Sequence, residues 1–332
     1  SYGVVKISTG CFYWFLSQEH KVFLCRMLGL FRSRGILTTN PITVGDHVEF
    51  EIDPAEGNGI ITNIHDRKNY IVRKSVKLSK QTHIIAANID QAFLLITLEH
   101  PKTFPAFIDR FLATAEAYHI ETVLLFNKVD LLDKDLEDQK NKLKELYEKI
   151  GYTCIDISAT EGLHVDRVKD LMIGKTSMFS GHSGVGKSTL INAISPGLNL
   201  KTAAVSEQHR QGQHTTTFAE MFVIETEPES YIIDTPGIKG FGVVDFEDNE
   251  VGNYFREFFA LKHLCKFNNC LHINEPKCAV KDALEKGEIA PSRYRSYLQI
   301  LAGEEENYRT NIYDLEYESG YPKSAKRIGK GR

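Results

Sequence analysis

Gly181–Ser188 carries the pattern with the clearest chemistry, G-x-x-x-x-G-K-[ST]. It follows the apolar run Ser177–Phe179 and opens a predicted helix, Lys187–Ile194, which is the strand–loop–helix context of a phosphate-binding loop. Glycines let backbone N–H groups turn toward a phosphate, and the helix N-terminus adds its positive end. We expect Lys187 to reach the β- and γ-phosphates and Ser188 to ligate Mg²⁺, the alternative being a glycine-rich turn. The predicted nucleotide contacts here are Gly181, His182, Ser183, Gly184, Val185, Gly186, Lys187, Ser188 and Thr189.

A second phosphate-related motif, Asp234-Thr-Pro-Gly237, follows the predicted strand Tyr231–Ile233. An Asp at a strand end downstream of such a loop organises Mg²⁺, and Gly237 can offer its N–H to the γ-phosphate. Between the two motifs, the polar segment Arg210–Thr217 is typical of a switch loop that places a hydroxyl on Mg²⁺. The hydroxyl would come from one of Thr215–Thr217, and we take Thr217 as the candidate. Two alternatives remain. Asp234–Gly237 could be a simple turn, and the three threonines could begin a strand.

The motif Asn127-Lys-Val-Asp130, after the apolar run Thr122–Phe126, indicates recognition of a base. A carboxylate can accept from both N1–H and N2–H₂ of guanine, and adenine has no such pair, so Asp130 would select guanine. Asn127 can bridge loops or contact the base, and the Lys128 stem can cover its face. Ser158-Ala159 also follows a predicted strand, and its N–H groups could bind the guanine carbonyl. Both motifs are short, but each follows an apolar strand, which is where open α/β sheets bind ligands, and this position supports the interpretation.

A third group of residues has the chemistry of a metal site. Cys265, Cys270, His272 and Cys278 offer three thiolates and one imidazole in a short stretch. Soft ligands in this number favour tetrahedral Zn²⁺, and four protein ligands predict a closed, structural site. The alternative is a set of unrelated buried thiols.

The elements that position these residues divide the chain into three parts. Residues 1–75 contain five short strand-like runs, which predict a small β-barrel of the OB-fold type, although an SH3-like barrel would give much the same pattern. The runs are Val4–Ile7, Phe12–Leu16, Val22–Cys25, His47–Glu51 and Gly59–Asn63.

Residues 76–248 alternate apolar strands with amphipathic helices, which predicts a doubly wound α/β domain. Its predicted helices include Ala106–Tyr118 and Asp135–Ile150, the latter ending at Gly151. Residues 249–332 are predicted to be mostly helical, over Val251–Phe259, Ala283–Glu288 and Ser292–Leu301, with a basic tail from Tyr321.

Composition limits the classes of protein. The 332 residues contain 40 Lys+Arg and 44 Asp+Glu, and a net charge of −4 argues against a small, wholly basic nucleic-acid-binding protein. Basic patches at Arg32-Ser-Arg34 and in the tail can still contact RNA, and Arg293–Tyr297 fits either RNA or helix packing.

No apolar run approaches the roughly 20 residues of a membrane span. Six cysteines are too few for a disulfide scaffold in a chain this long. We expect a cytoplasmic monomer with reduced thiols and no membrane contact.

The order of the motifs is unusual, because the guanine motif precedes the phosphate-binding loop. This order resembles that of the circularly permuted GTPases. With an N-terminal barrel and a C-terminal Cys/His cluster, the chain resembles the RsgA (YjeQ) family, whose members act in assembly of the small ribosomal subunit. The resemblance implies a multidomain fold, namely a barrel, a circularly permuted P-loop GTPase domain and a mostly α zinc-binding domain. It implies GTP/GDP, Mg²⁺ and one structural Zn²⁺ as cofactors, and the small ribosomal subunit with its rRNA as partner.

The implied reaction is hydrolysis of GTP to GDP and phosphate, stimulated by the subunit, with Lys187, Asp234, Gly237 and His214 as catalytic residues. Small GTPases commonly carry Gln after Asp-x-x-Gly to orient water, but this chain has Ile238. His214 matches the family's switch-loop His, to which that role is attributed, and an exposed polar residue is the alternative. We therefore expect slow intrinsic turnover. Gln213 replaces the family's usual Arg, and Gly184 stands where potassium-activated GTPases carry Asn, so no potassium site is predicted.

Two other functions remain open at this point. The chain could be a nucleotide-switched RNA-binding module in which hydrolysis is incidental. It could also be a GTPase of tRNA modification or metal delivery, which additional Cys or His residues near the switch segments would favour.

Overall fold

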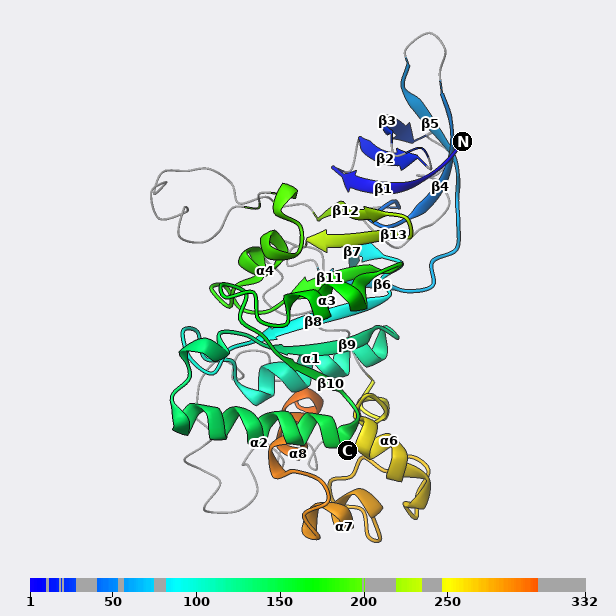
Figure 1. Cartoon of the computed structure of the whole chain (residues 1–332). Helices are drawn as coiled ribbons and strands as arrows, with labels where there is room; N and C mark the ends of the chain where they lie inside the picture. Colours follow the sequence, from blue (N-terminus) through cyan, green and yellow to red (C-terminus); the bar gives the residue numbers. More distant parts are fainter. Residues whose placement is uncertain are drawn as a thin grey trace, which may run out of the picture.

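A computed structural model describes residues 1–9, 12–17, 19, 21–27, 41–52, 57–74, 82–198, 200, 219–234 and 247–303. Figure 1 shows the barrel at one end of the molecule, the α/β sheet in the middle and the C-terminal helices at the other end. The outer parts therefore flank the central domain from opposite sides. Within the described ranges, no helix has both the length and the apolar character to cross a bilayer.

The N-terminal part is a closed five-stranded barrel in which β1 pairs with both β2 and β4, and β3 and β5 run parallel. This pairing order is that of a Greek-key barrel, and it confirms the OB-type prediction. Tyr13, Phe15 and Phe50 fill its core. The strands are β1 (Tyr2–Ser8), β2 (Tyr13–Ser17), β3 (Val22–Met27), β4 (His47–Ile52) and β5 (Gly59–Ile64).

The central sheet has the order β10-β9-β8-β11-β13-β12, in which only β12 is antiparallel to its neighbour. All six residues of β8 are buried, as expected of a parallel strand covered on both faces. A single pairing, Ile7 with Glu220, continues the hydrogen-bonded sheet into the barrel. The strands are β8 (Gln91–Ile96), β9 (Glu121–Phe126), β10 (Thr153–Asp156), β11 (Thr176–Ser180), β12 (Glu220–Thr226) and β13 (Glu229–Asp234).

Helices cover both faces of this sheet, which confirms the doubly wound α/β prediction. One apolar core joins one face of the sheet to α1 (Pro105–Ala117) and α2 (Lys134–Ile150). A second core joins the other face to α3 (Val165–Met172) and α4 (Lys187–Ile194). Two short 3₁₀ helices, η2 (Val129–Leu131) and η3 (Pro196–Leu198), lie in loops. As predicted, α2 ends at Gly151 in the left-handed conformation, whereas α3 was not predicted.

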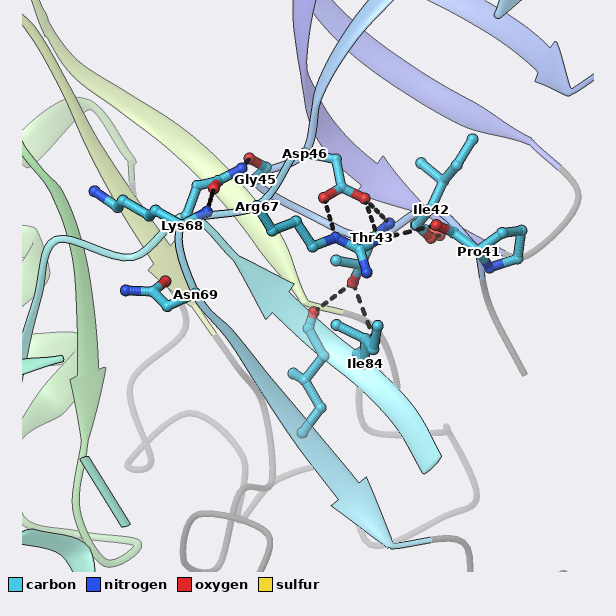
Figure 2. Close-up of polar contacts among 12 residues, drawn as sticks. Pro41, Ile42, Thr43, Gly45, Asp46, Arg67, Lys68, Asn69 and Ile84 are labelled. Carbon is cyan, nitrogen blue, oxygen red and sulfur yellow. Dashed lines mark hydrogen bonds and ion pairs between the residues drawn. The ribbon is translucent and has the colours of Figure 1, made fainter. Parts of the chain in front are cut away.

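A separate hairpin of β6 (Tyr70–Lys74) and β7 (Thr82–Ala87), also not predicted, joins the barrel to the central domain. Figure 2 shows the polar contacts that fasten it. Arg67 donates from Nε and Nη2 to the two carboxylate oxygens of buried Asp46, at 2.6 and 2.7 Å. The Thr43 hydroxyl lies 3.0 Å from the carbonyl oxygens of both Ile84 and Ile85 on β7. The predicted domain boundary after residue 75 falls between β6 and β7.

The C-terminal part is helical, and its described residues contain no strand, as predicted. The predicted helix Val251–Phe259 is divided at Phe255, and Ala283–Glu288 is shifted toward the N-terminus because Gly287 in the left-handed conformation ends the helix early. The elements are η4 (Val251–Tyr254), α6 (Arg256–Leu261), η5 (Lys262–Leu264), α7 (Ala279–Glu285) and α8 (Pro291–Leu301).

Arg293 on α8 is buried, as are Tyr294, Ser296 and Tyr297. Its guanidinium donates to Asp109 on α1 at 2.8 Å and to both carboxylate oxygens of Glu257 on α6 at 2.7 and 3.1 Å. Of the two interpretations of Arg293–Tyr297, the structure therefore supports helix packing, because four of these five residues are buried and only Arg295 is partly exposed.

Candidate functional site

The loop Gly181–Gly186 connects β11 to α4, as the sequence predicts. Gly181, Gly184 and Gly186 have φ values of 143°, 86° and 99°, which L side chains rarely adopt. Space is also restricted, because a Cβ on Gly186 would lie 2.4 Å from Nδ2 of Asn127. Glycine at position 186 thus lets the loop approach the guanine motif closely.

Lys187 begins α4 and folds back over the loop. Its Nζ donates to the carbonyl oxygens of Gly181 at 2.8 Å and His182 at 3.1 Å. Burial lowers the pKa of Lys187, and the charge of Asp234 at the end of β13 acts in the opposite direction. The charge of Asp234 therefore favours the ammonium form of Lys187, against the effect of burial.

Asn127 joins the three predicted motifs. Its Nδ2 donates to the Val185 carbonyl at 2.7 Å, and its Oδ1 accepts from the Ala159 N–H at 3.1 Å. The side chain is 3% exposed, so these bonds form away from water. Of the two roles considered for Asn127, the structure has the bridge between loops.

Lys128 adds a second connection to the phosphate-binding loop. Its backbone is left-handed, with φ 64°, and its Nζ donates to the carbonyl oxygens of Gly184 at 2.8 Å and His100 at 2.6 Å. Asp130 follows in η2, on the same loop. The base motif and the phosphate motif are thus held in one hydrogen-bonded unit at the carboxyl ends of β9, β10 and β11.

The loop of Ser158 and Ala159 is closed by its own contacts. The Ser158 N–H donates to the Leu163 carbonyl at 3.3 Å, and its Oγ lies 3.2 Å from Oγ1 of Thr160. The Ala159 N–H already donates to Oδ1 of Asn127, which the sequence did not predict. A guanine carbonyl that binds this N–H would therefore share it with Asn127. Among the other predicted residues, His214, Thr217 and Gly237 lie outside the described residues.

The four predicted metal ligands lie together, with one ligand atom from each within 4.8 Å of the others. Nδ1 of His272 lies 3.3 Å from Sγ of Cys278 and 3.7 Å from Sγ of Cys265, and the two sulfurs are 4.0 Å apart. A tetrahedral zinc ion with usual bond lengths would hold S···S pairs at about 3.8 Å and S···N pairs at about 3.5 Å. The donor set and its spacing therefore fit Zn²⁺.

The turn that carries His272 is itself held in place. The Glu275 carboxylate accepts the N–H groups of Leu271, Ile273 and Asn274 at 2.8, 2.9 and 3.0 Å. Burial alone would raise the pKa of Glu275, but these hydrogen bonds leave it below its ordinary value. Tyr294 donates to the His272 carbonyl at 2.6 Å. Tyr297 donates to the Leu271 carbonyl, also at 2.6 Å. The sequence did not predict these supports, because a lone Glu and two helical tyrosines carry no motif.

Comparisons with known proteins identify the family. The RsgA N-terminal domain model matches residues 2–61, and the RsgA GTPase model matches residues 64–244. The chain belongs to the RsgA family. Proteins named small ribosomal subunit biogenesis GTPase RsgA are similar over nearly their whole length. The one from Flavobacterium johnsoniae is 59% identical over 94% of this chain and 96% of its own, and the one from Christiangramia forsetii is 61% identical over 94% and 99%.

Solved structures of RsgA relatives agree with this assignment. The crystal structure of YjeQ from Thermotoga maritima is 34% identical, with a TM-score of 0.74, over 91% of this chain and 97% of that chain. YloQ, described as a circularly permuted GTPase, is 31% identical with a TM-score of 0.70, over 91% and 94%. These findings confirm the predicted family and the circular permutation. RsgA proteins are GTPases, so this chain belongs to a family of hydrolases that use GTP, GDP and Mg²⁺.

Proposed function

We propose that this chain binds GTP and hydrolyses it to GDP and phosphate during maturation of the small ribosomal subunit. The relatives that carry this function in their names match nearly the whole chain. The observation that carries the proposal is the Asn127 bridge, which joins the predicted phosphate-binding loop to both predicted base-binding loops. A nucleotide lying across this bridge would contact all three loops.

Each predicted residue has a proposed role. The amides of Gly181–Gly186 and the Lys187 ammonium would hold the phosphates, and Asp130 would accept from guanine. Ser188 and Thr217 would ligate Mg²⁺, and Asp234 would organise it. The Lys187 ammonium, which now donates to two carbonyl groups, would turn to a phosphate on binding. His214 is proposed to orient the attacking water, because Ile238 has no hydrogen-bonding group.

We also propose that Cys265, Cys270, His272 and Cys278 hold one structural Zn²⁺. All four ligands come from protein, so the ion would have no open position for catalysis. It would fix the fold of the C-terminal part, in which the cluster and its neighbours form a shared core with Phe255 and Phe258.

The partner proposal is the small ribosomal subunit and its rRNA, contacted by a monomer in the cytoplasm without membrane binding. On the barrel, Arg26 lies over the half-exposed Phe12 ring, at 5.5 Å from its centroid, and Lys21 is exposed nearby in sequence. Such cation–aromatic pairs suit stacked bases and phosphates. Arg32 and Arg34 lie outside the described residues. We propose the division into 1–75, 76–248 and 249–332 for the barrel, the GTPase domain and the zinc-binding part.

The proposal is tested by the rate of GTP hydrolysis with and without purified small ribosomal subunits, with ATP as the control substrate. We expect slow turnover alone, faster turnover with subunits and none with ATP. Equal hydrolysis of ATP would contradict the guanine assignment. A Lys187→Ala protein that still releases normally from the subunits would instead support the alternative, an RNA-binding module in which hydrolysis is incidental.

A base swap tests Asp130 directly. Xanthine has a carbonyl group where guanine has its 2-amino group, so Asp130→Asn, which can donate there, should lose GTP and gain xanthosine triphosphate. Lys187→Ala is the control, because it should weaken both nucleotides equally. If Asp130→Asn weakened both nucleotides alike, Asp130 would not be the base-reading residue.

A further inference from the structure

The phosphate-binding loop has a contact that its motif does not predict. Phe107, in the first turn of α1, packs its ring against the imidazole of His182, with the ring centroids 4.0 Å apart and the planes tilted by 30°. Phe107 is 3% exposed and belongs to the core between α1 and the sheet. A rigid, buried side chain therefore supports the first turn of the loop.

The loop needs such support because its backbone is permissive. Three of its six residues are glycines with positive φ values. Val185 is buried in the core on the α4 side of the sheet, whereas His182 packs on Phe107 from the α1 side. The His182 carbonyl is also one of the two oxygens that accept from Lys187. Displacing His182 would therefore disturb the loop and its lysine together.

Helix α1 is in turn fixed from its other side. Asp109 lies two residues after Phe107, about 200° around the helix axis, so the two side chains project in nearly opposite directions. Buried Asp109 accepts from Arg293 and from the Tyr147 hydroxyl, each at 2.8 Å. Helix α1 is thus clamped between the C-terminal helices and the phosphate-binding loop.

We propose that Phe107 is a positioning residue for the phosphate-binding loop and acts through His182. This inference rests on the proposed nucleotide function. With the ring in place, the loop is held near its binding geometry before the nucleotide arrives. Without it, binding must also order the loop, and affinity falls.

A double-mutant cycle tests the proposal, using GDP binding to the full chain and steady-state GTP hydrolysis. Loss of one aromatic contact predicts that Phe107→Leu weakens GDP binding about threefold to tenfold and raises KM for GTP, while kcat at saturating GTP changes less than about twofold. His182→Leu should give the same loss. The double variant should bind no more weakly than either single variant, because both remove one contact.

Phe111→Leu is the matched control, since Phe111 lies one turn further along α1 in the same core. It should lower the melting temperature as much as Phe107→Leu but leave GDP affinity within about twofold of the parent chain. Should Phe107→Leu fold poorly, His182→Leu still carries the affinity test.

The proposal is overturned if the losses of GDP affinity at Phe107 and His182 add in the double variant, because His182 would then act on the nucleotide directly. It is also overturned if Phe111→Leu lowers GDP affinity as much as Phe107→Leu does. If the unsubstituted chain binds no guanine nucleotide, the proposed function fails instead, so the two failures are distinguishable.

Discussion

The barrel and the C-terminal helices are both attached to the central domain, but by different chemistry. At the barrel joint, Thr43 donates to backbone carbonyl groups of β7, and Asn88 donates to the Gly45 carbonyl at 2.9 Å. The ion pair between Arg67 and Asp46 leaves the arginine side chain 18% exposed, whereas the aspartate side chain is buried. At the C-terminal joint, the Arg293 side chain is 1% exposed and lies between two carboxylates.

The difference concerns what each joint loses when one partner is removed. Hydrogen bonds between neutral groups, such as those that buried Thr43 and Asn88 donate, contribute modestly to stability. Removing the arginine from a buried charge network costs more, because it leaves carboxylates buried without compensation. Burial alone would lower the pKa of Arg293, but Asp109 and Glu257 raise it above its ordinary value. The C-terminal joint is therefore the more sensitive of the two.

The largest expected effect comes from the metal. Cys278→Ser, or removal of Zn²⁺ by a chelator, should abolish the folded C-terminal part, because zinc binding contributes on the order of 10 kcal/mol in small zinc-dependent folds. The barrel should not respond. Amide hydrogen exchange over residues 247–303 measures the first effect, and fluorescence of Trp14, the chain's one tryptophan and part of β2, measures the second. Retained protection over 247–303 without metal would contradict the zinc proposal.

The next effect is at the C-terminal joint. Arg293→Met should lower the free energy of unfolding of this part by about 3–5 kcal/mol, because Asp109 and Glu257 lose their shared cation. Urea unfolding followed by zinc release measures it, and the Trp14 transition should stay at its midpoint. The triple change Arg293→Met, Asp109→Leu, Glu257→Leu is the control, since removing the charges as well should restore much of the loss. A triple variant no more stable than Arg293→Met would count against the charge argument.

At the barrel joint, Asp46→Ala should lower the free energy of unfolding by about 2–3 kcal/mol, less than Arg293→Met, because Arg67 can turn to water. The urea midpoint of the Trp14 transition should fall, and the midpoint of zinc release should stay the same. Arg293→Met should give the opposite pattern. Asp46→Asn is the control and should lose about half as much, since it keeps an acceptor for the Thr43 N–H, which Asp46 accepts at 2.8 Å. If both variants moved both transitions equally, the two joints would not be independent.

The sequence predicted one kind of feature well. The phosphate-binding loop and the bounds of α4 were predicted correctly because a contiguous motif specifies strand, loop and helix together. The clustering of Cys265, Cys270, His272 and Cys278 was predicted because their spacing is short and their residue types are unusual. Such features depend on neighbours in the sequence, which a single chain displays.

Features built from distant residues were not predictable in this way. Arg293 and Asp109 are 184 positions apart, so nothing near Arg293 could decide between RNA contact and helix packing. The hairpin of β6 and β7 was missed, and the contacts that hold it join residues far apart in the sequence, such as Thr43 and Ile84, which are 41 positions apart. The Asn127 bridge was one of two open roles, and the fold brings Asn127 to partners 58 and 32 positions away.

The smallest expected effect comes from comparing an exposed arginine, Arg256, with the buried Arg293 in the same C-terminal joint. Arg256 on α6 pairs with Glu116 on α1, donates to the Gly151 carbonyl at 2.8 Å and lies 4.0 Å from the Tyr152 ring centroid. Its side chain is 34% exposed, so solvent screens the ion pair, and Arg256→Gln should lower the free energy of unfolding by only about 1 kcal/mol. High salt should reduce this loss and leave that of Arg293→Met nearly unchanged, because screening acts on exposed pairs. Urea unfolding at two ionic strengths measures both. An equal salt response at the two arginines would mean that burial does not set the sensitivity of this joint.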